Sequence, residues 1–452
     1  MALKFTHFGG VMSKLLLNKS ESSNPIYSSK DYKRTRAAYI SQASFEYFVA
    51  LVAADSFLAI LLNHIGFSDS LIGIISSLVT FAFLFELITV SVANKIRRVK
   101  PLAVTTHLFT AVFATILYLA PFFNVSDNLR TVLVASAILI RSISSCLMSA
   151  FVFKWSSAYI EPKKRASFGA IKEKISLVSG IIVSLGMGYG VDKFKDADNI
   201  NGAFILLAVG TLIFGLMDVA SLLLMKNQED DISGEEELPS ISAALPRIFK
   251  SKPYRRAFIL NCAWYFAYYM THSFIGIYKT KDLLISLTLI ETFNFVGIAA
   301  RYFLSSPIGK YSDKTSYAKG IRLGLTFGLL AFVSMIFTAP STWWIIVAYT
   351  IFLNISGAGT GQNFANITFD CVEEKYFVHA TAIKSAAAGL TAFFASIVGG
   401  AILDRIQQNG NVIFGIHVMP QQVLAAISAL LTLMLIFFCK DTNEDDLDKS
   451  RS

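Results

Sequence analysis

The chain has little charge, few cysteines and no recognisable catalytic motif. Only 16% of its 452 residues are charged, whereas soluble domains carry about 25%. Its four cysteines show neither CxxC nor mixed His/Cys ligand spacing, which argues against a disulfide framework and against a zinc site. A Walker loop, HExxH and G-x-S-x-G are all absent, so we expect neither an enzyme nor ATP-driven transport. We also expect no cofactor and no metal.

The net charge of +9 does not point to nucleic acid, because the basic residues lie in short clusters between apolar segments. About 35 mostly polar residues precede the first long apolar run, which is unlike a cleavable signal peptide. Most of the 40 Lys and Arg residues fall on the side that both termini and the central linker share. The positive-inside rule therefore predicts a multi-pass protein of the cell membrane with both termini in the cytoplasm.

What the sequence has in abundance is apolar segments of membrane-crossing length, since 54% of its residues are hydrophobic. We expect an all-α fold of twelve spans in two sets of six, because helices satisfy their own backbone hydrogen bonds in lipid. The first set lies near 37–63, 68–93, 101–123, 130–154, 172–191 and 202–225, and the second near 255–278, 282–305, 320–339, 342–369, 380–403 and 414–439. The expected units are a tail (1–36), a six-helix bundle (37–225), a linker (226–253), a second bundle (254–439) and a tail (440–452).

An internal repeat relates the two sets. Residues 161–193 align with 373–405, which brings together several identical residues in equivalent spans. The matched pairs are Ile171 and Ile383, Lys172 and Lys384, Ser184 and Ser396, Gly188 and Gly400, and Asp192 and Asp404. Duplication of a six-helix unit explains these matches, and two similar halves form a natural interface for a central site.

The loop after the eighth expected span reads GKYSDK, in which Gly309, Asp313 and Lys314 fit the pattern G-x-x-x-D-[RK]. The loop after the second span is degenerate, with Asn94 and Lys95 in the last two places. In these motifs, in span number and in its repeat, the chain resembles the major facilitator superfamily from about residue 37 to 439. The resemblance implies two bundles around a cavity that opens alternately to either side, with these two loops as gates.

Ionisable side chains at bilayer depth are costly, so they are the first candidates for a transport pathway. We single out five as candidates at this depth: Glu46, Asp55, Glu86, Arg141 and Glu291. Several proton-coupled members of the family use a first-helix carboxylate and a fourth-helix arginine. By that resemblance, protonation of Glu46 or Asp55 alternates with pairing to Arg141; the alternative is a structural ion pair between helices.

Three further groups of polar residues suit a substrate cavity. One face of span seven carries Asn261, Tyr265, Tyr268 and His272; span eight carries Glu291 and Asn294; span ten carries Gln362 and Asn366 beside several glycines. Hydrogen bonding between helices is the alternative role for each group.

These features favour a proton-coupled or facilitative transporter of a small organic solute such as a sugar, glycoside or organic acid. The alternatives are an exporter of amphipathic drugs or lipids and a non-transporting membrane receptor. Arg141 is followed by serines rather than by the R-x-x-Q-G pattern of drug antiporters, which argues against drug export. The expected partners are the solute, protons and the lipid bilayer, with no nucleic acid, and the expected state is a monomer.

Overall fold

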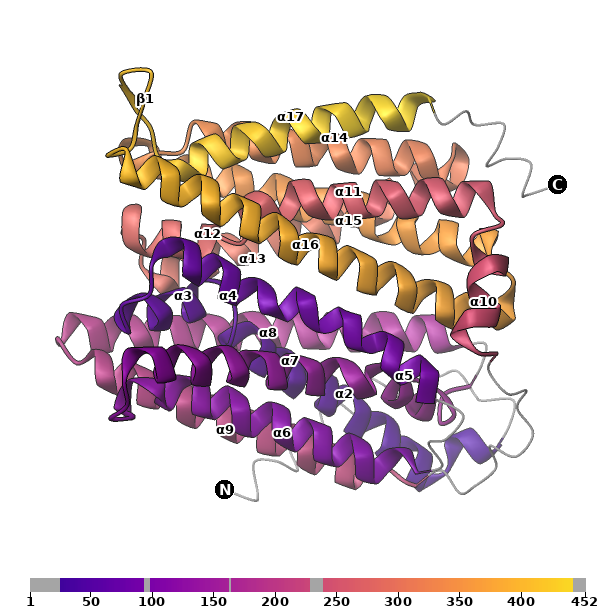
Figure 1. Cartoon of the computed structure of the whole chain (residues 1–452). Coiled ribbons are helices and arrows are strands. Elements are labelled where there is room, and N and C mark those ends of the chain that lie inside the picture. Colours follow the sequence, from indigo (N-terminus) through magenta and orange to yellow (C-terminus); the bar gives the residue numbers. More distant parts are fainter. Residues whose placement is uncertain (1–24, 93–97, 162–163, 228–238, 442–452) are drawn as a thin grey trace.

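The computed structural model describes residues 25–92, 98–161, 164–227 and 239–441. Two helical halves lie side by side, with the first in indigo to magenta and the second in red to yellow (Figure 1). The short helix α10 (Ile241–Ile248) lies at one end of the molecule, and the hairpin β1–β2 lies at the other. We call these the linker end and the hairpin end.

The first half begins with a broken helix. The segments α2 (Lys30–Val52) and α3 (Asp55–His64) meet at a 40° bend, and Asp55 starts α3 with a φ of 42°. A positive φ is uncommon for an Asp, so this break is a specific feature of the fold. The other elements are η1 (Pro25–Ser28), α4 (Asp69–Phe81), η2 (Ala82–Phe85), α5 (Glu86–Val92), α6 (Val99–Leu119), η4 (Ala120–Phe122), α7 (Asp127–Ser157), α8 (Arg165–Asp196) and α9 (Ile200–Leu224).

The second half follows α10, which packs on it through Ala244 and Ile248. Its elements are α11 (Lys252–His272), α12 (Ile275–Ile277), η6 (Tyr278–Asp282), α13 (Leu287–Lys314), α14 (Tyr317–Ile336), η7 (Pro340–Ile345), α15 (Ile346–Cys371), η8 (Glu374–Tyr376), α16 (Phe377–Gln408), β1 (Val412–Ile413), β2 (Ile416–His417) and α17 (Pro420–Asp441). The two strands pair antiparallel, with Val412 opposite His417. The last span thus begins at Pro420, because the segment expected to start it at 414 forms this hairpin.

Ten helical segments in the described residues are long and apolar enough to cross a membrane, and the bent pair α2–α3 makes an eleventh. The helix at the place of the seventh expected span, α11, has 21 residues but is not among them. Its charged and polar residues, among them Arg255, Arg256 and Asn261, account for this. The expected number of twelve is therefore not confirmed, whereas the all-α membrane fold in two bundles is. Large apolar side chains on the outside, such as Ile182, Phe303 and Phe437, suit contact with lipid.

Polar contacts between the halves gather at the hairpin end, where α4 and α8 of the first half meet α16 and α13 of the second. Asp192, near the end of α8, accepts hydrogen bonds from the backbone N–H groups of Leu287 and Thr288 at 3.0 and 2.8 Å, at the start of α13. Asp404, its partner in the repeat, accepts a hydrogen bond of 2.8 Å from Ser70 of α4. The repeat seen in the sequence therefore places equivalent carboxylates at equivalent contacts between the halves.

Candidate functional site

A cavity of about 480 Å³ lies at the middle depth of the second half and reaches the first half at Asp55. That volume suits a small organic molecule. Most of the lining comes from α11, α13, α15 and α16, with Lys279 contributed by η6. The lining includes Asp55, Asn261, Trp264, Tyr265, Tyr268, Tyr269, His272, Lys279, Asn294, Arg301, Tyr349, Asn354, Gly357, Gly361, Phe364, Lys384 and Ser385.

One wall of the cavity is aromatic. The rings of Tyr265 and Tyr269 stack with centroids 5.8 Å apart, and Tyr268 lies 4.6 Å from the His272 ring. His272 Nδ1 is 3.4 Å from the Tyr349 hydroxyl, which holds the imidazole against α15. All four residues that the sequence suggested on this helix, Asn261 included, line the cavity. The wall offers stacking surface and hydroxyl groups to a bound ring.

The hairpin end of the cavity is closed by an ion pair between the halves. Lys279 Nζ donates to Asp55 Oδ2 at 3.3 Å, and the lysine side chain is only 6% exposed. The turn of backbone that starts α3 brings Asp55 against Gly276, since a Cβ on that glycine would lie 2.9 Å from the Asp55 carbonyl oxygen. Among the described residues, Asp55 supplies the carboxylate of the cavity lining, and the break between α2 and α3 positions it.

The polar residues of α13 and α15 are only partly where the sequence suggested. Asn294 lines the cavity, and Glu291 is buried beside it, accepting a hydrogen bond of 3.3 Å from the Asn294 amide. Gln362 and Asn366 do not line the cavity. On that helix it is Asn354, Gly357 and Gly361 that do so, because they lie on a different face of α15.

The cavity is also lined by three basic residues that we did not predict there from the sequence, Arg301, Lys279 and Lys384. Arg301 stood near the end of an expected span over 282–305, whereas α13 runs from Leu287 to Lys314 and places it at mid-helix. The position of Arg301 at mid-helix could have been predicted only by extending the helix through Pro307 to the GKYSDK motif. Lys384 donates to the Phe364 carbonyl oxygen at 3.0 Å and to Thr368 at 2.8 Å.

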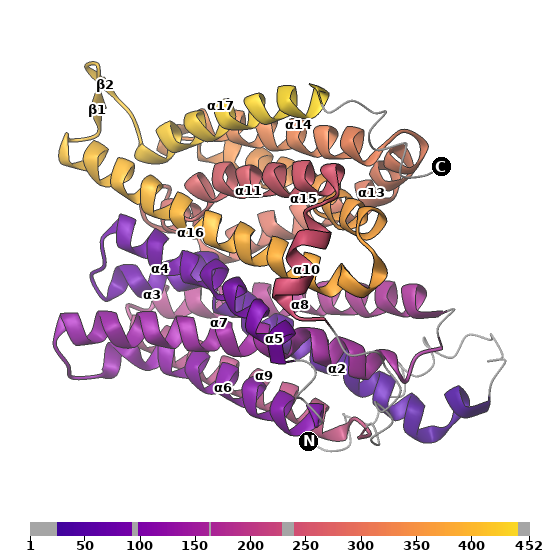
Figure 2. The same ribbon diagram turned by 45° about the vertical axis from the view of Figure 1, so that its right-hand side comes forward.

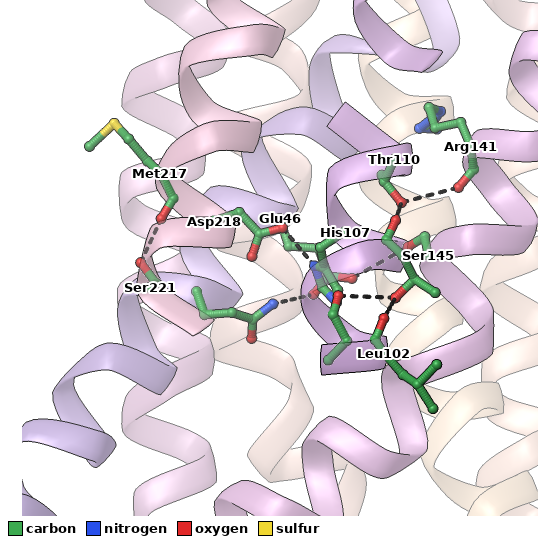
Figure 3. Close-up of polar contacts among 12 residues, drawn as sticks. Glu46, Leu102, His107, Thr110, Arg141, Ser145, Met217, Asp218 and Ser221 are labelled. Carbon is green, nitrogen blue, oxygen red and sulfur yellow. Dashed lines mark hydrogen bonds and ion pairs between the residues drawn. The ribbon is translucent and has the colours of Figure 1, made fainter. Parts of the chain in front are cut away.

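The first half holds a second polar cluster, drawn in Figure 3. Glu46 of α2 accepts hydrogen bonds from Gln42 at 3.1 Å and from Ser145 at 3.4 Å. Arg141 of α7 is buried, and its Nε has no hydrogen-bond partner in the described part of the chain. In this conformation neither of these two described carboxylates forms an ion pair with Arg141: Glu46 accepts the two hydrogen bonds above, and Asp55 pairs with Lys279.

Next to Glu46 lies a buried pair that sequence reading missed. His107 Nδ1 of α6 is 2.6 Å from Asp218 Oδ2 of α9 (Figure 3). Both residues fall in expected spans, so their ionisable side chains at bilayer depth were the signal that could have found them. Among the described residues, no group of three or more His, Cys, Asp or Glu side chains is placed to hold a metal ion.

Those expected gating residues that the structure describes lie at the linker end. Gly309, Asp313 and Lys314 are in the last turns of α13, and the side chains of Asp313 and Lys314 are exposed. Asn94 and Lys95 lie outside the described residues. The view in Figure 2 brings this end of the molecule forward.

Comparison with solved structures shows the same fold in several transporters. The nucleoside transporter NupG matches with a TM-score of 0.68 at 13% identity, over 91% of this chain and 98% of that one. A D-xylose-proton symporter matches with 0.66 at 13% identity, over 91% and 98%. The POT family transporter PepTSo matches with 0.66 at 10% identity, over 91% and 99%. No curated protein matches the sequence.

A family model described as Major Facilitator Superfamily matches residues 42–374, which is well over half of the chain. The match agrees with the all-α membrane fold in two bundles. This chain therefore belongs to the Major Facilitator Superfamily.

Proposed function

We propose that this transporter moves a small polar organic solute, such as a sugar, glycoside or organic acid, across the cell membrane by proton-coupled alternating access. The proposal includes cytoplasmic termini and two moving bodies, residues 37–225 and 254–439. The observation that carries it is the cavity of about 480 Å³, lined at mid-depth by aromatic and amide side chains and closed at one end by the Asp55–Lys279 ion pair. A polar solute that loses its hydration water on binding can form hydrogen bonds with these hydroxyl and amide groups instead.

The contacts between the halves support alternating access. Asp55, Asp192 and Asp404 all join the halves at the hairpin end. At the linker end Asp313 and Lys314 are exposed, as we expect for gate residues that have released their partners. The arrangement fits a conformation that is closed at the hairpin end, which lies outside the cell in the proposed topology.

Asp55 is the candidate for coupling to protons. Its carboxylate holds Lys279 of the other half, so adding a proton removes one charge of the pair and weakens the closure. Glu46 and Arg141 form a second candidate site, in which a change of conformation brings the guanidinium to the carboxylate. One structural neighbour is a D-xylose-proton symporter, which supports this type of coupling.

Flux in proteoliposomes tests the proposal. We expect accumulation of radiolabelled solute from a panel of sugars, glycosides and organic acids when a pH gradient is imposed, and loss of the gradient-driven part in Asp55→Asn. Glu46→Gln tests the second site, and Asp198→Asn, on an exposed loop at the hairpin end, is the matched control. Absence of flux for the entire panel contradicts transport; gradient-driven flux that persists in both Asp55→Asn and Glu46→Gln contradicts the proposed coupling.

A further inference from the structure

Arg301 places a guanidinium group in the cavity at the middle of α13. Its side chain is exposed to the cavity and lies over the glycine face of α15, with Nη1 3.8 Å from where a Gly357 Cβ would be. In the described part of the chain, no carboxylate oxygen lies within 4.0 Å of the Arg301 guanidinium, the distance that an ion pair requires.

The other charged groups around the cavity already have partners. Lys279 pairs with Asp55, and Lys384 donates to Phe364 and Thr368. Two carboxylates stand behind the lining: Glu291 holds the Asn294 amide, and Glu86 interacts with the Ser385 hydroxyl. Within the described residues, Arg301 is therefore the cation of the lining that lacks an acceptor.

A guanidinium stays charged at any physiological pH, and at bilayer depth it needs an anion, water or carbonyl groups around it. Its planar fork matches a carboxylate or a phosphate with two parallel hydrogen bonds. The aromatic wall of α11 lies in the same cavity and offers stacking surface to a ring. These two features suit the two parts of one molecule, an apolar ring and an acidic group.

We propose that the solute is an organic anion whose ring packs against Tyr265, Tyr268 and Tyr269 and whose carboxylate or phosphate pairs with Arg301. This inference rests on the proposed function, because it names the class of solute that the cavity takes. It selects the organic acid among the solutes considered above. The neutral sugar and glycoside lack the group that Arg301 would bind.

The test uses the purified full chain and pairs of probes that differ in one acidic group: benzoate and benzamide, glucuronate and glucose, and uridine monophosphate and uridine. Apparent affinities come from the rise in unfolding temperature with probe concentration. We expect the anionic member of at least one pair to bind about 10-fold or more tightly than its neutral partner. The inference is overturned if no anionic probe stabilises the protein more than its neutral partner does.

Substitution then assigns the preference to one side chain. Arg301→Gln should abolish the anionic preference, and Arg301→Lys should retain part of it because charge remains without the fork. Lys310→Gln removes one exposed positive charge from the same helix outside the cavity and should leave the preference unchanged. An anionic preference that survives in Arg301→Gln overturns the assignment. Transport of neutral solutes alone contradicts this inference and leaves the proposed function standing, whereas lack of flux for any solute contradicts the proposed function.

Discussion

His107 and Asp218 join α6 to α9 through a contact of 2.6 Å inside the first half, with side chains only 2% and 4% exposed. The second atom of each group, His107 Nε2 and Asp218 Oδ1, is buried without a hydrogen-bond partner in the described residues. Each group therefore offsets much of the cost of burying the other in a region of low dielectric. Removing one member of such a pair leaves a buried, unpaired polar group.

We predict that His107→Leu and Asp218→Leu each lower the free energy of unfolding by about 3–5 kcal/mol, because each strands its partner. The double variant should lose much less than the sum of the two, since two apolar side chains need no partner. Thermal unfolding of the detergent-purified protein measures all three. Asp196→Ala, which breaks the exposed pair with Lys193, should change stability by no more than about 0.5 kcal/mol. Additive losses in the double variant would show that the pair has no mutual dependence.

A second prediction concerns Asp192, which accepts three hydrogen bonds from the start of α13, including one of 2.6 Å from the Thr288 hydroxyl. A carboxylate at a helix N-terminus is stabilised by the backbone N–H groups and by the helix dipole. We predict that Asp192→Ala opens the hairpin end in a larger share of molecules. Spin labels at Asn63 and Gln408, exposed on opposite halves at this end, measure the distance once the four native cysteines are replaced.

Asp404→Ala is the comparison for that experiment. Asp404 accepts one hydrogen bond from Ser70, so its loss should shift the distance distribution less than the loss of Asp192 does. Equal distributions for wild type and Asp192→Ala would show that this contact does not hold the halves together.

Much of the fold follows from the sequence because apolar run length and the repeat are physical requirements of a membrane bundle. The ends of spans were harder to predict. Residues 414–417 were expected to start the last span but belong to the hairpin 412–417, in or beside which Asn411, Phe414 and two glycines have positive φ. Such turns depend on local backbone conformation, which a hydropathy window averages out.

The lining residues on one face of a single helix were predicted from the sequence. Those whose position depends on how several helices pack were missed. The stripe on α11 was evident from helical periodicity alone, and all four of its residues line the cavity. Gln362 was expected to line the cavity and does not, because periodicity does not show which face of α15 turns inward. Arg301 required the correct end of α13, and the Asp55–Lys279 pair required the break between α2 and α3.

A third prediction uses the close approach of α16 to the first half at Gly389. A Cβ on this residue would collide with the Thr80 carbonyl oxygen and would lie 2.9 Å from the Phe83 Cβ. Overpacking of this kind costs about 1–3 kcal/mol, which is enough to shift a two-state equilibrium about 10-fold. We predict that Gly389→Ala favours the conformation open at the hairpin end, as measured with the same spin labels. Gly186→Ala, where no atom lies within 4 Å, should leave the distribution unchanged.

The last prediction concerns pH and Asp282, which ends η6 at the hairpin end outside the membrane spans. Burial and, to a smaller extent, the charge of Asp69 raise the pKa of its carboxyl to about 6, while Lys281 acts in the opposite direction. Because the folded pKa exceeds that of the unfolded chain, protonated Asp282 favours folding, and this contribution is lost as pH rises towards 6 and above.

We therefore predict that the unfolding temperature of the wild type falls relative to that of Asp282→Asn between about pH 4 and pH 6, and that the difference stays constant above that range. The Asn variant keeps the neutral form at every pH, so subtracting its curve removes the titration of all other groups. Asp198→Asn, at an exposed position of the same end, should run parallel to the wild type. A wild type that gains stability relative to Asp282→Asn over this range would mean that Asp282 is held ionised, with Lys281 rather than burial dominating its surroundings.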